Sequence, residues 1–211
     1  GTMSREIVLG TIDKYDWIQI GGAIQHPDRG KIFDISDDTA KETGVEDAYL
    51  KIYPVDGYGS PEVLRDVMEI EKPDAILHYT DPRFWGWLYQ MEHELRQHIP
   101  IYYYNIWDDL PYPRWNEPFY ESCDLIMNIS KQTVNIVDNV CQIKPRTEWD
   151  NTYIPHGINE NNFYPVDSSH KEWGDLLQFR RTVTGGKDYK YIVFWNNRNI
   201  RRKLPADVIM A

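Results

Sequence analysis

The sequence predicts an α/β fold in which a parallel sheet has helices on both faces. Between residues 50 and 154, apolar strand-like segments alternate with segments of helical period at least four times. The strand-like segments are almost continuously apolar, as expected where both faces of a strand are buried. Helix-start signals separate several of them, since Ser60 precedes Pro61 and Asp81 precedes Pro82. These observations together favour a parallel sheet over an antiparallel one.

The first 60 residues are less regular. Residues 6–12 and 50–55 read as strands. Residues 17–24 are apolar but contain a glycine pair, so they form either a strand or a tight loop approached by another segment. Residues 31–36 are a short extended run, and residues 39–47 are polar and expected at the surface. Gly1-Thr2-Met3 resembles a cloning remnant and is left out of the fold prediction.

The alternation is clear from residue 60 onwards. The predicted strands are residues 74–79, 99–106, 125–129 and 152–154. The predicted helices begin after Ser60, after Asp81, at Glu117 and after Ser130. On the second of them, Phe84, Leu88, Met91 and Leu95 share one face, which predicts a single amphipathic helix.

The pattern changes after Pro165. Residues 170–183 are expected to be helical, residues 190–195 to form a new strand, and residues 204–211 to begin a helix. We therefore divide the chain into a first domain at 4–155, a linker with its helix at 156–187, and the start of a second domain at 188–211.

Charge and composition restrict the partners. The formal net charge is −10, which disfavours nucleic acid and anionic membrane as partners. No apolar run is long enough for a transmembrane helix. Cys123 and Cys141 have no metal-binding spacing and are expected to be reduced and buried, which favours the cytoplasm.

Ligands of parallel α/β folds bind at the carboxyl ends of the strands. Asp108 and Asp109 follow a predicted strand, where one of them suits a general base or a group that orients a hydroxyl. Asp81 occupies a similar position. The alternative for all three is helix capping or turn formation, in which aspartate is common.

A basic cluster stands out in this acidic chain. Arg198, Arg201, Arg202 and Lys203 lie between a predicted strand end and a predicted helix start. Cations and backbone N–H groups at such a place form an anion site, typically for phosphate. The alternative is a solvated basic turn.

The segment from Tyr153 to Pro165 connects the two regions. It reads as the end of a buried strand, a proline that stops the sheet, and Gly157 as a turn glycine. It is either an ordinary strand exit or a junction between two domains. His93 to His98 nearly matches a zinc-protease motif, but its second histidine is five residues on and off the helical face, so we predict no metal site there.

Three motifs together resemble the retaining glycosyltransferases of the GT-B fold, of the glycosyl transferase group 1 type. They are Ile154-Pro-His-Gly-Ile-Asn159 with Phe163 and Pro165, Phe194-Trp-Asn-Asn-Arg198 with Lys203, and Cys123-Asp-Leu-Ile-Met-Asn-Ile-Ser130-Lys131. The resemblance covers roughly residues 70–211 and implies a Rossmann-like first domain on the acceptor side. Trp107 stands where the family often has a histidine, while Asp108 is kept.

The resemblance also implies roles. The enzyme would move a sugar from a nucleotide-sugar donor to a hydroxyl-bearing acceptor, with no metal and no further cofactor. Arg198 and Lys203 would hold the donor diphosphate, and Arg202 would add a phosphate contact. Asp108 and His156 would be catalytic. Gly157, Asp81 and Trp107 would line the cleft.

The resemblance leads us to expect a fragment. Family members carry a strand, a glycine-rich loop and a helix before the segment that resembles residues 6–12, and most of a donor domain beyond residue 211. We therefore expect weak activity from these residues alone, and association into a homodimer that covers apolar surface. The alternative is a non-catalytic carbohydrate-binding or scaffold module that stacks sugars on Trp85, Trp107, Tyr112 and Trp115.

Overall fold

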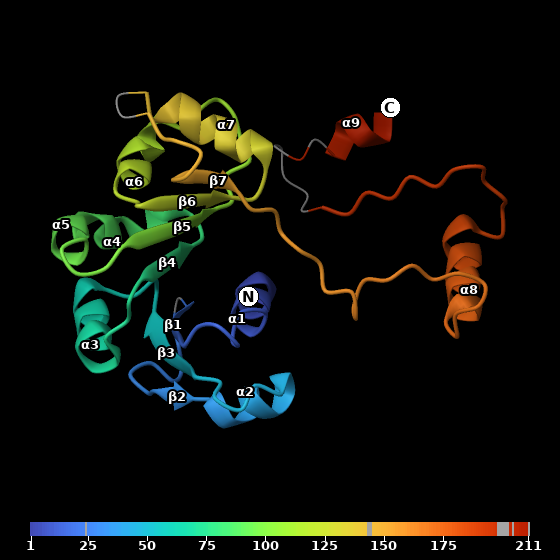
Figure 1. The fold of residues 1–211 in the computed structure, drawn as a ribbon. Coiled ribbons are helices and arrows are strands. Elements are labelled where there is room, and N and C mark those ends of the chain that lie inside the picture. Colours follow the sequence, from blue (N-terminus) through green and yellow to red (C-terminus); the bar gives the residue numbers. More distant parts are fainter. Residues whose placement is uncertain (24, 143–144, 198–202, 204, 211) are drawn as a thin grey trace. The chain divides into compact units, whose positions relative to one another are not determined.

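A computed structural model describes residues 1–23, 25–142, 145–197, 203 and 205–210. The chain divides into two compact units, Gly1–Gly157 and Ile158–Ala211. The first unit contains all the strands of the described residues (Figure 1).

A four-stranded sheet forms the centre of the first unit. Its strands are β4 (Ile76–Tyr79), β5 (Ile101–Asn105), β6 (Leu125–Asn128) and β7 (Asn151–Tyr153), and they follow one another in that order. Every neighbouring pair is parallel. The predicted α/β class is confirmed: the sheet is all parallel and flanked by helices, consistent with a Rossmann-like fold.

A second sheet of three strands precedes it. Its strands are β1 (Trp17–Ala23), β2 (Phe33–Asp34) and β3 (Leu50–Asp56), in the order β1-β3-β2. Strands β1 and β3 are parallel, and β2 runs antiparallel to β3. The glycine pair therefore lies in a strand. A Cβ on Gly22 would lie 2.7 Å from the carbonyl oxygen of Gly57, so only glycine fits where the loop after β3 crosses.

Helices connect these strands. The α-helices of the first unit are α1 (Thr2–Leu9), α2 (Ser36–Thr43), α3 (Pro61–Glu71), α4 (Gly86–Gln90), α5 (Glu92–Leu95), α6 (Glu117–Glu121) and α7 (Lys131–Val140). Two short 3₁₀ helices are η1 (Pro82–Trp85) and η2 (Arg114–Asn116). Figure 1 shows α6 and α7 beside β6 and β7, and α7 contacts both of those strands.

The predicted caps are confirmed. The Ser60 side chain accepts a hydrogen bond from the Val63 N–H, and the Asp81 carboxylate accepts one from the Arg83 N–H. The Ser130 hydroxyl accepts a hydrogen bond from the Thr133 N–H. Each satisfies one of the backbone donors that a helix start leaves without an intrahelical partner.

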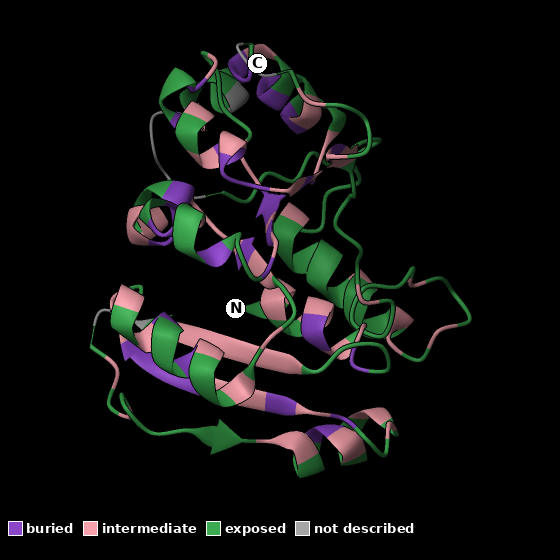
Figure 2. Cartoon of the chain, turned by 60° about the vertical axis from the view of Figure 1, so that its left-hand side comes forward, coloured by how far each residue is buried: buried purple, intermediate pink, exposed green. Residues whose placement is uncertain are grey.

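Two hydrophobic cores hold the first unit together (buried residues are purple in Figure 2). The larger core joins residues of β5 and β6 to residues of α3 through α7. Ile20 of β1 also packs against it, which ties the three-stranded sheet to the four-stranded one. Cys123 and Cys141 are both free and buried, as predicted.

Two secondary-structure predictions are wrong in this unit. Residues 6–12 are not a strand: helix α1 covers most of them, and Val8 and Ile12, four residues apart, are buried in the smaller core. A short apolar run is compatible with both the helical and the strand period of hydrophobic residues. Here the packing of Val8 and Ile12 against Leu50 favours the helix. The single helix predicted after Asp81 is broken into η1, α4 and α5, because the backbone leaves helical geometry at Trp85 and at Met91.

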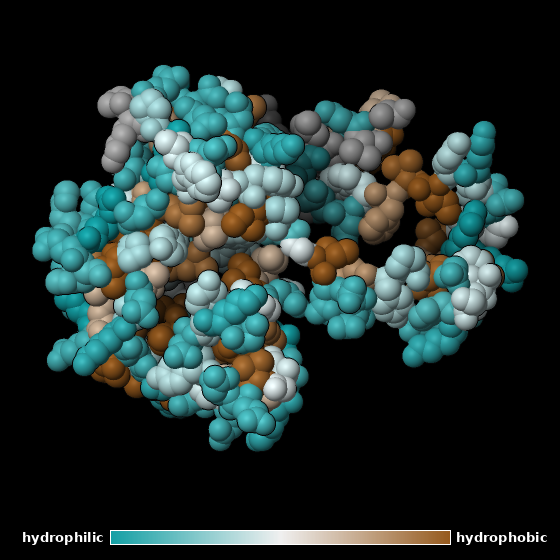
Figure 3. Space-filling model, viewed as in Figure 1, coloured by the Kyte–Doolittle hydropathy of each residue, from teal (hydrophilic) through white to brown (hydrophobic). Residues whose placement is uncertain are grey.

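The second unit has helices α8 (Trp173–Thr184) and α9 (Pro205–Met210) among its described residues. The predicted helix at 170–183 is thus confirmed, but residues 190–197 form no strand. A strand needs a neighbour for its backbone hydrogen bonds, and the described part of this unit has no second extended segment paired with it. Val193 and Phe194 are more than four-fifths exposed. Apolar surface is visible along this unit in Figure 3.

Among the helices of the described residues, none has both the length and the apolar character that crossing a membrane requires.

Candidate functional site

Polar and aromatic side chains meet at the carboxyl ends of β4, β5 and β7. Asp81 follows directly after β4. Its carboxylate accepts hydrogen bonds from Nη2 of Arg83 at 2.6 Å and from Nε of Arg83 at 3.0 Å. Its hydrogen bond with Arg83 lowers the pKa of Asp81 below the ordinary value. Asp81 is therefore an ionised carboxylate with a fixed direction, as well as the cap of η1.

Trp107 is the next group along this edge. The guanidinium of Arg83 lies over its indole ring, 5.1 Å from the ring centre. The Trp107 N–H donates to Oδ1 of Asn105 at 3.1 Å, and its indole N–H donates to the carbonyl of Asp109 at 2.9 Å. Its carbonyl accepts from the Thr133 hydroxyl at 2.9 Å. The loop after β5 is therefore anchored to the sheet and to α7.

Asp108 follows in the same loop and is exposed. Its carbonyl accepts from Nε2 of Gln132 at 3.4 Å. The carboxylate of Asp109 accepts from the neighbouring Leu110 N–H, so Asp109 forms a turn. This contact matches the turn-forming alternative for Asp109.

His156 reaches the same edge from the end of β7. Its ring stacks on Tyr104 of β5, with centroids 5.4 Å apart and an interplanar angle of 21°. The Tyr104 hydroxyl donates to the Ile154 carbonyl at 3.0 Å, which holds the departing chain over the sheet. Tyr79 of β4 lies next to Tyr104, with centroids 5.6 Å apart. Asp81, Trp107 and His156 thus belong to one edge of one sheet.

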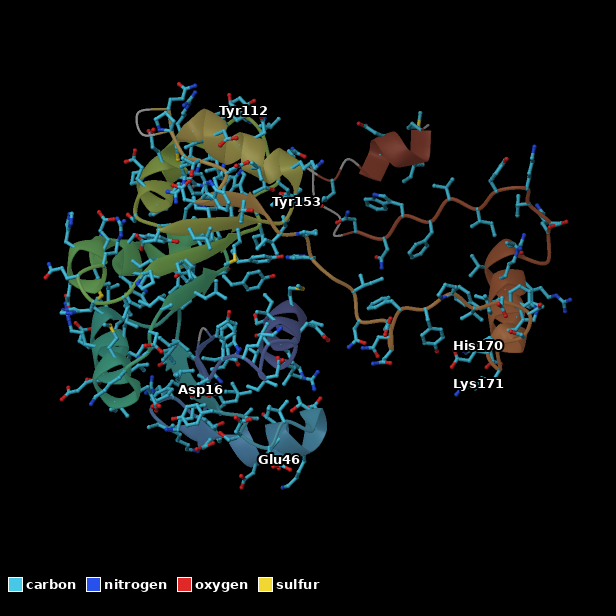
Figure 4. The ribbon with its side chains drawn as sticks, viewed as in Figure 1. Asp16, Glu46, Tyr112, Tyr153, His170 and Lys171 are labelled. Carbon is cyan, nitrogen blue, oxygen red and sulfur yellow. The ribbon has the colours of Figure 1, made fainter. Side chains whose placement is uncertain are left out.

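Two expectations about the exit from β7 are wrong. Tyr153 and Ile154 were expected in a buried strand end, but they are 45% and 41% exposed, because β7 is the edge strand of its sheet. Figure 4 labels Tyr153 where the chain leaves β7. Gly157 does not have a positive φ, and a Cβ there would meet nothing within 4 Å. Its position needs no glycine for conformational reasons.

The predicted phosphate-binding cations are not all described. Arg198 and Arg202 lie outside the described residues. Lys203 is half-buried in the second unit. The anion site therefore stays a prediction.

Four features of this edge were missed by the sequence analysis. Thr80, between β4 and Asp81, has φ of 148°, a region that residues other than glycine rarely adopt, and Tyr103 donates to its carbonyl at 3.0 Å. Such strain tends to occur at functional sites. Arg83 was missed because its role depends on its contacts with Asp81 and Trp107, and the contact with Trp107 is formed only in the folded chain. His78 was missed because a lone histidine in an apolar strand gives no signal of its surroundings.

The fourth feature is a row of buried asparagines beneath the loops. Asn105 Nδ2 donates to Oδ1 of Asn128 at 3.1 Å, and Asn128 Nδ2 donates to Oδ1 of Asn151 at 2.7 Å. Asn151 in turn donates to the Asp138 carboxylate on α7 at 2.7 Å. The row links β5, β6, β7 and α7 just below the candidate site. Asn105 and Asn128 are each one residue before the end of a predicted strand, 99–106 and 125–129, which was the one signal available in the sequence.

His78 lies in the core beside the same edge. Burial lowers its pKa to about 3, so the ring is neutral. Nδ1 lies 2.6 Å from the Tyr89 hydroxyl, and the ring stacks on Tyr103 with centroids 4.9 Å apart. These contacts make His78 part of the support for the site.

A cavity of about 210 Å³ lies elsewhere, around Arg96, Asp124 and Arg146. Arg96 is paired with Asp124 at 2.7 Å, and Arg146 donates to the carbonyls of Tyr120 and Cys123. Both cations already have protein partners, so we assign this cavity a structural role. Among the described residues, no group of three or more His, Cys, Asp or Glu side chains is arranged to hold a metal ion.

Comparisons with protein-family models, with curated proteins and with solved structures gave no match.

Proposed function

We propose that the chain is part of a glycosyltransferase that moves a sugar from a nucleotide-sugar donor to a hydroxyl acceptor. The observation that carries the proposal is the gathering of Asp81, Trp107 and His156 at the carboxyl edge of a parallel four-stranded sheet. Ligands of such sheets bind at that edge. In this proposal the first unit is the acceptor side of the enzyme.

The division of the chain gives a second line of support. The first unit ends at Gly157, within the motif Ile154 to Asn159 that resembles the domain crossing of the GT-B family. His156 and Gly157 are then the last residues before the second unit. The resemblance of this motif to a domain crossing therefore agrees with the point where the chain divides.

Each of the predicted site residues has a role in the proposed reaction. The bond between the sugar C1 and the diphosphate oxygen breaks, and C1 forms a bond with the acceptor oxygen. Asp108 takes the proton of the acceptor hydroxyl, and His156 orients the reacting groups. Arg198 and Lys203 stabilise the negative charge on the departing diphosphate, with Arg202 beside them. Fixed charges at a developing anion are commonly the largest contribution to catalysis.

Titration of a nucleoside diphosphate tests the donor side. We expect Arg198→Ala to weaken binding by about 1.5–3 kcal/mol, the range for hydrogen bonds to charged groups. Arg181→Ala is the matched control, because Arg181 lies in α8 of the same unit. Equal affinities for wild type and Arg198→Ala would remove the diphosphate assignment.

A non-catalytic carbohydrate-binding module is the second candidate. It is favoured by the contact of Trp107 with Trp115, whose rings meet edge to face with centroids 6.1 Å apart, and by the 54% exposure of Trp115. Trp85, Tyr112 and also Trp107 pack against the larger core, so Trp115 is the most exposed of the four rings. Saccharide binding without any nucleotide binding or sugar transfer would favour this candidate.

A further inference from the structure

Two aromatic rings stack in an exposed position near the candidate site. Tyr58, in the loop after β3, lies on Phe84 of η1 with centroids 4.9 Å apart and an interplanar angle of 11°. Tyr58 is 43% exposed and Phe84 is 52% exposed. The stacked pair forms a contiguous apolar surface that is in contact with water, and contiguous apolar surface is the kind that serves as a binding site.

The pair is held in place from beneath. Tyr58 also meets Trp85 edge to face at 6.0 Å, and Trp85 packs against Trp87 and His78. Gly59 has φ of 82°, and a Cβ there would lie 3.6 Å from the Trp87 ring. The loop that carries Tyr58 is therefore packed on the same aromatic base as η1, and the two rings are presented at a fixed position.

The sequence neighbour of Phe84 in η1 connects this pair to the candidate site. Phe84 adjoins Arg83 in η1, the Arg83 guanidinium covers one side of Trp107, and Trp107 meets Trp115. We call Tyr58, Phe84, Arg83, Trp107 and Trp115 the aromatic strip. It runs from the loop after β3 to η2 and passes the carboxylate of Asp81.

We propose that the aromatic strip binds the acceptor, and that the acceptor is a neutral saccharide chain of more than one sugar ring. This inference rests on the proposed function. Sugar rings have apolar C–H faces that pack on aromatic rings and hydroxyl rims that hydrogen-bond to carboxylates and guanidinium groups. The aromatic strip offers rings for the C–H faces, and the Asp81–Arg83 ion pair between those rings offers charged groups for the hydroxyls.

Other ligand classes fit the strip less well. A lipid chain favours a continuous apolar surface, whereas an ion pair interrupts this one. A nucleic acid is disfavoured by the formal net charge of −10. A chain of sugars matches the succession of separate rings, because each ring can meet one sugar face.

The test uses an array of neutral oligosaccharides of common hexoses, one to five units long, followed by calorimetry on the best binder. We expect affinity to rise with length. Phe84→Ala and Trp115→Ala should each weaken binding about threefold to tenfold, the range for one aromatic contact. Trp149→Ala is the control, since Trp149 is 83% exposed in the loop before β7 and outside the strip. Circular dichroism checks that each variant is folded.

Several outcomes would overturn the inference. One is no oligosaccharide binding, or binding that does not depend on length. Another is a Phe84→Ala variant that binds as wild type does. A third is binding to phosphatidylcholine vesicles that the same substitutions abolish, which would assign the strip to lipid. Saccharide binding that persists while diphosphate binding is absent would instead contradict the glycosyltransferase proposal and leave the strip assignment standing.

Discussion

Asn128 donates a hydrogen bond to Asn151 across β6 and β7, with 2.7 Å between Nδ2 and Oδ1. Its own Oδ1 accepts from Asn105 on the other side, and all three side chains are buried. The interior of a parallel sheet is usually apolar. Here the asparagine row uses side-chain amides to fix the strand ends that carry the candidate site.

Removing the middle of this row should be costly. Asn128→Ala leaves an amide of Asn105 and a carbonyl oxygen of Asn151 buried without a partner, and we expect a loss of about 2–4 kcal/mol in the free energy of unfolding. Urea unfolding followed by tryptophan fluorescence measures it. Asn135→Ala, at an exposed position of α7, should change stability little. A similar stability for both variants would show that the row does not hold the sheet edge.

A buried carboxylate gives a pH-dependent prediction. Glu71 accepts hydrogen bonds from Tyr49, Lys51 and Tyr53, and its side chain is 4% exposed. Burial opposes ionisation, but these hydrogen bonds outweigh it and lower the pKa of Glu71 below 4.5. Its stabilising contribution is therefore complete above pH 4.5 and is lost as pH falls through the lowered pKa.

Glu71→Gln should remove that acid dependence. At pH 7 we expect it to lower stability by about 1.5–3 kcal/mol, because Lys51 loses its charged partner. The difference from wild type should shrink at pH 3. Glu94→Gln is the control, since Glu94 forms an exposed pair with Arg65. A difference that is the same at pH 7 and pH 3 would contradict the assignment.

His78 should stay neutral in the folded protein well below pH 6. Its pKa is lowered to about 3 by burial, whereas in the unfolded chain it takes up a proton near pH 6.5. The unfolded state then binds more protons between these values, so this histidine makes stability fall as pH drops from 6.5 towards 3. NMR of the His78 ring should show no titration between pH 7 and pH 4.5 in the folded protein and a titration in urea. A folded-state midpoint near 6 would show that the ring is accessible to water.

The cap of α7 should influence the loop that carries Trp107. Ser130 accepts from the Thr133 N–H at 3.0 Å, and the Thr133 hydroxyl donates to the Trp107 carbonyl. Ser130→Ala should lower stability by about 1 kcal/mol, and Ser130→Asp should restore most of it because aspartate also caps. Hydrogen exchange at residues 105–109 should quicken in Ser130→Ala. If Ser130→Asp is as unstable as Ser130→Ala, the capping contact is not the cause.

The sequence by itself determined the parallel α/β sheet of the first unit. The signals that predicted it act within a few residues: apolar runs for β4 to β6, and cap residues at Ser60, Asp81 and Ser130. It also located the edge where Asp81, Trp107, Asp108 and His156 lie, because ligand edges follow from strand direction alone.

Tertiary structure decided which side chains meet. Tyr104 and His156 are distant in sequence but stack, and Asn105 bonds to Asn128 from 23 residues away. Packing also made α1 a helix where the apolar run allowed a strand, and left residues 190–197 without the strand that their composition favours. The physical reason is the same in each case. Such contacts depend on neighbours brought together by the folded chain, and local periodicity carries no information about those neighbours.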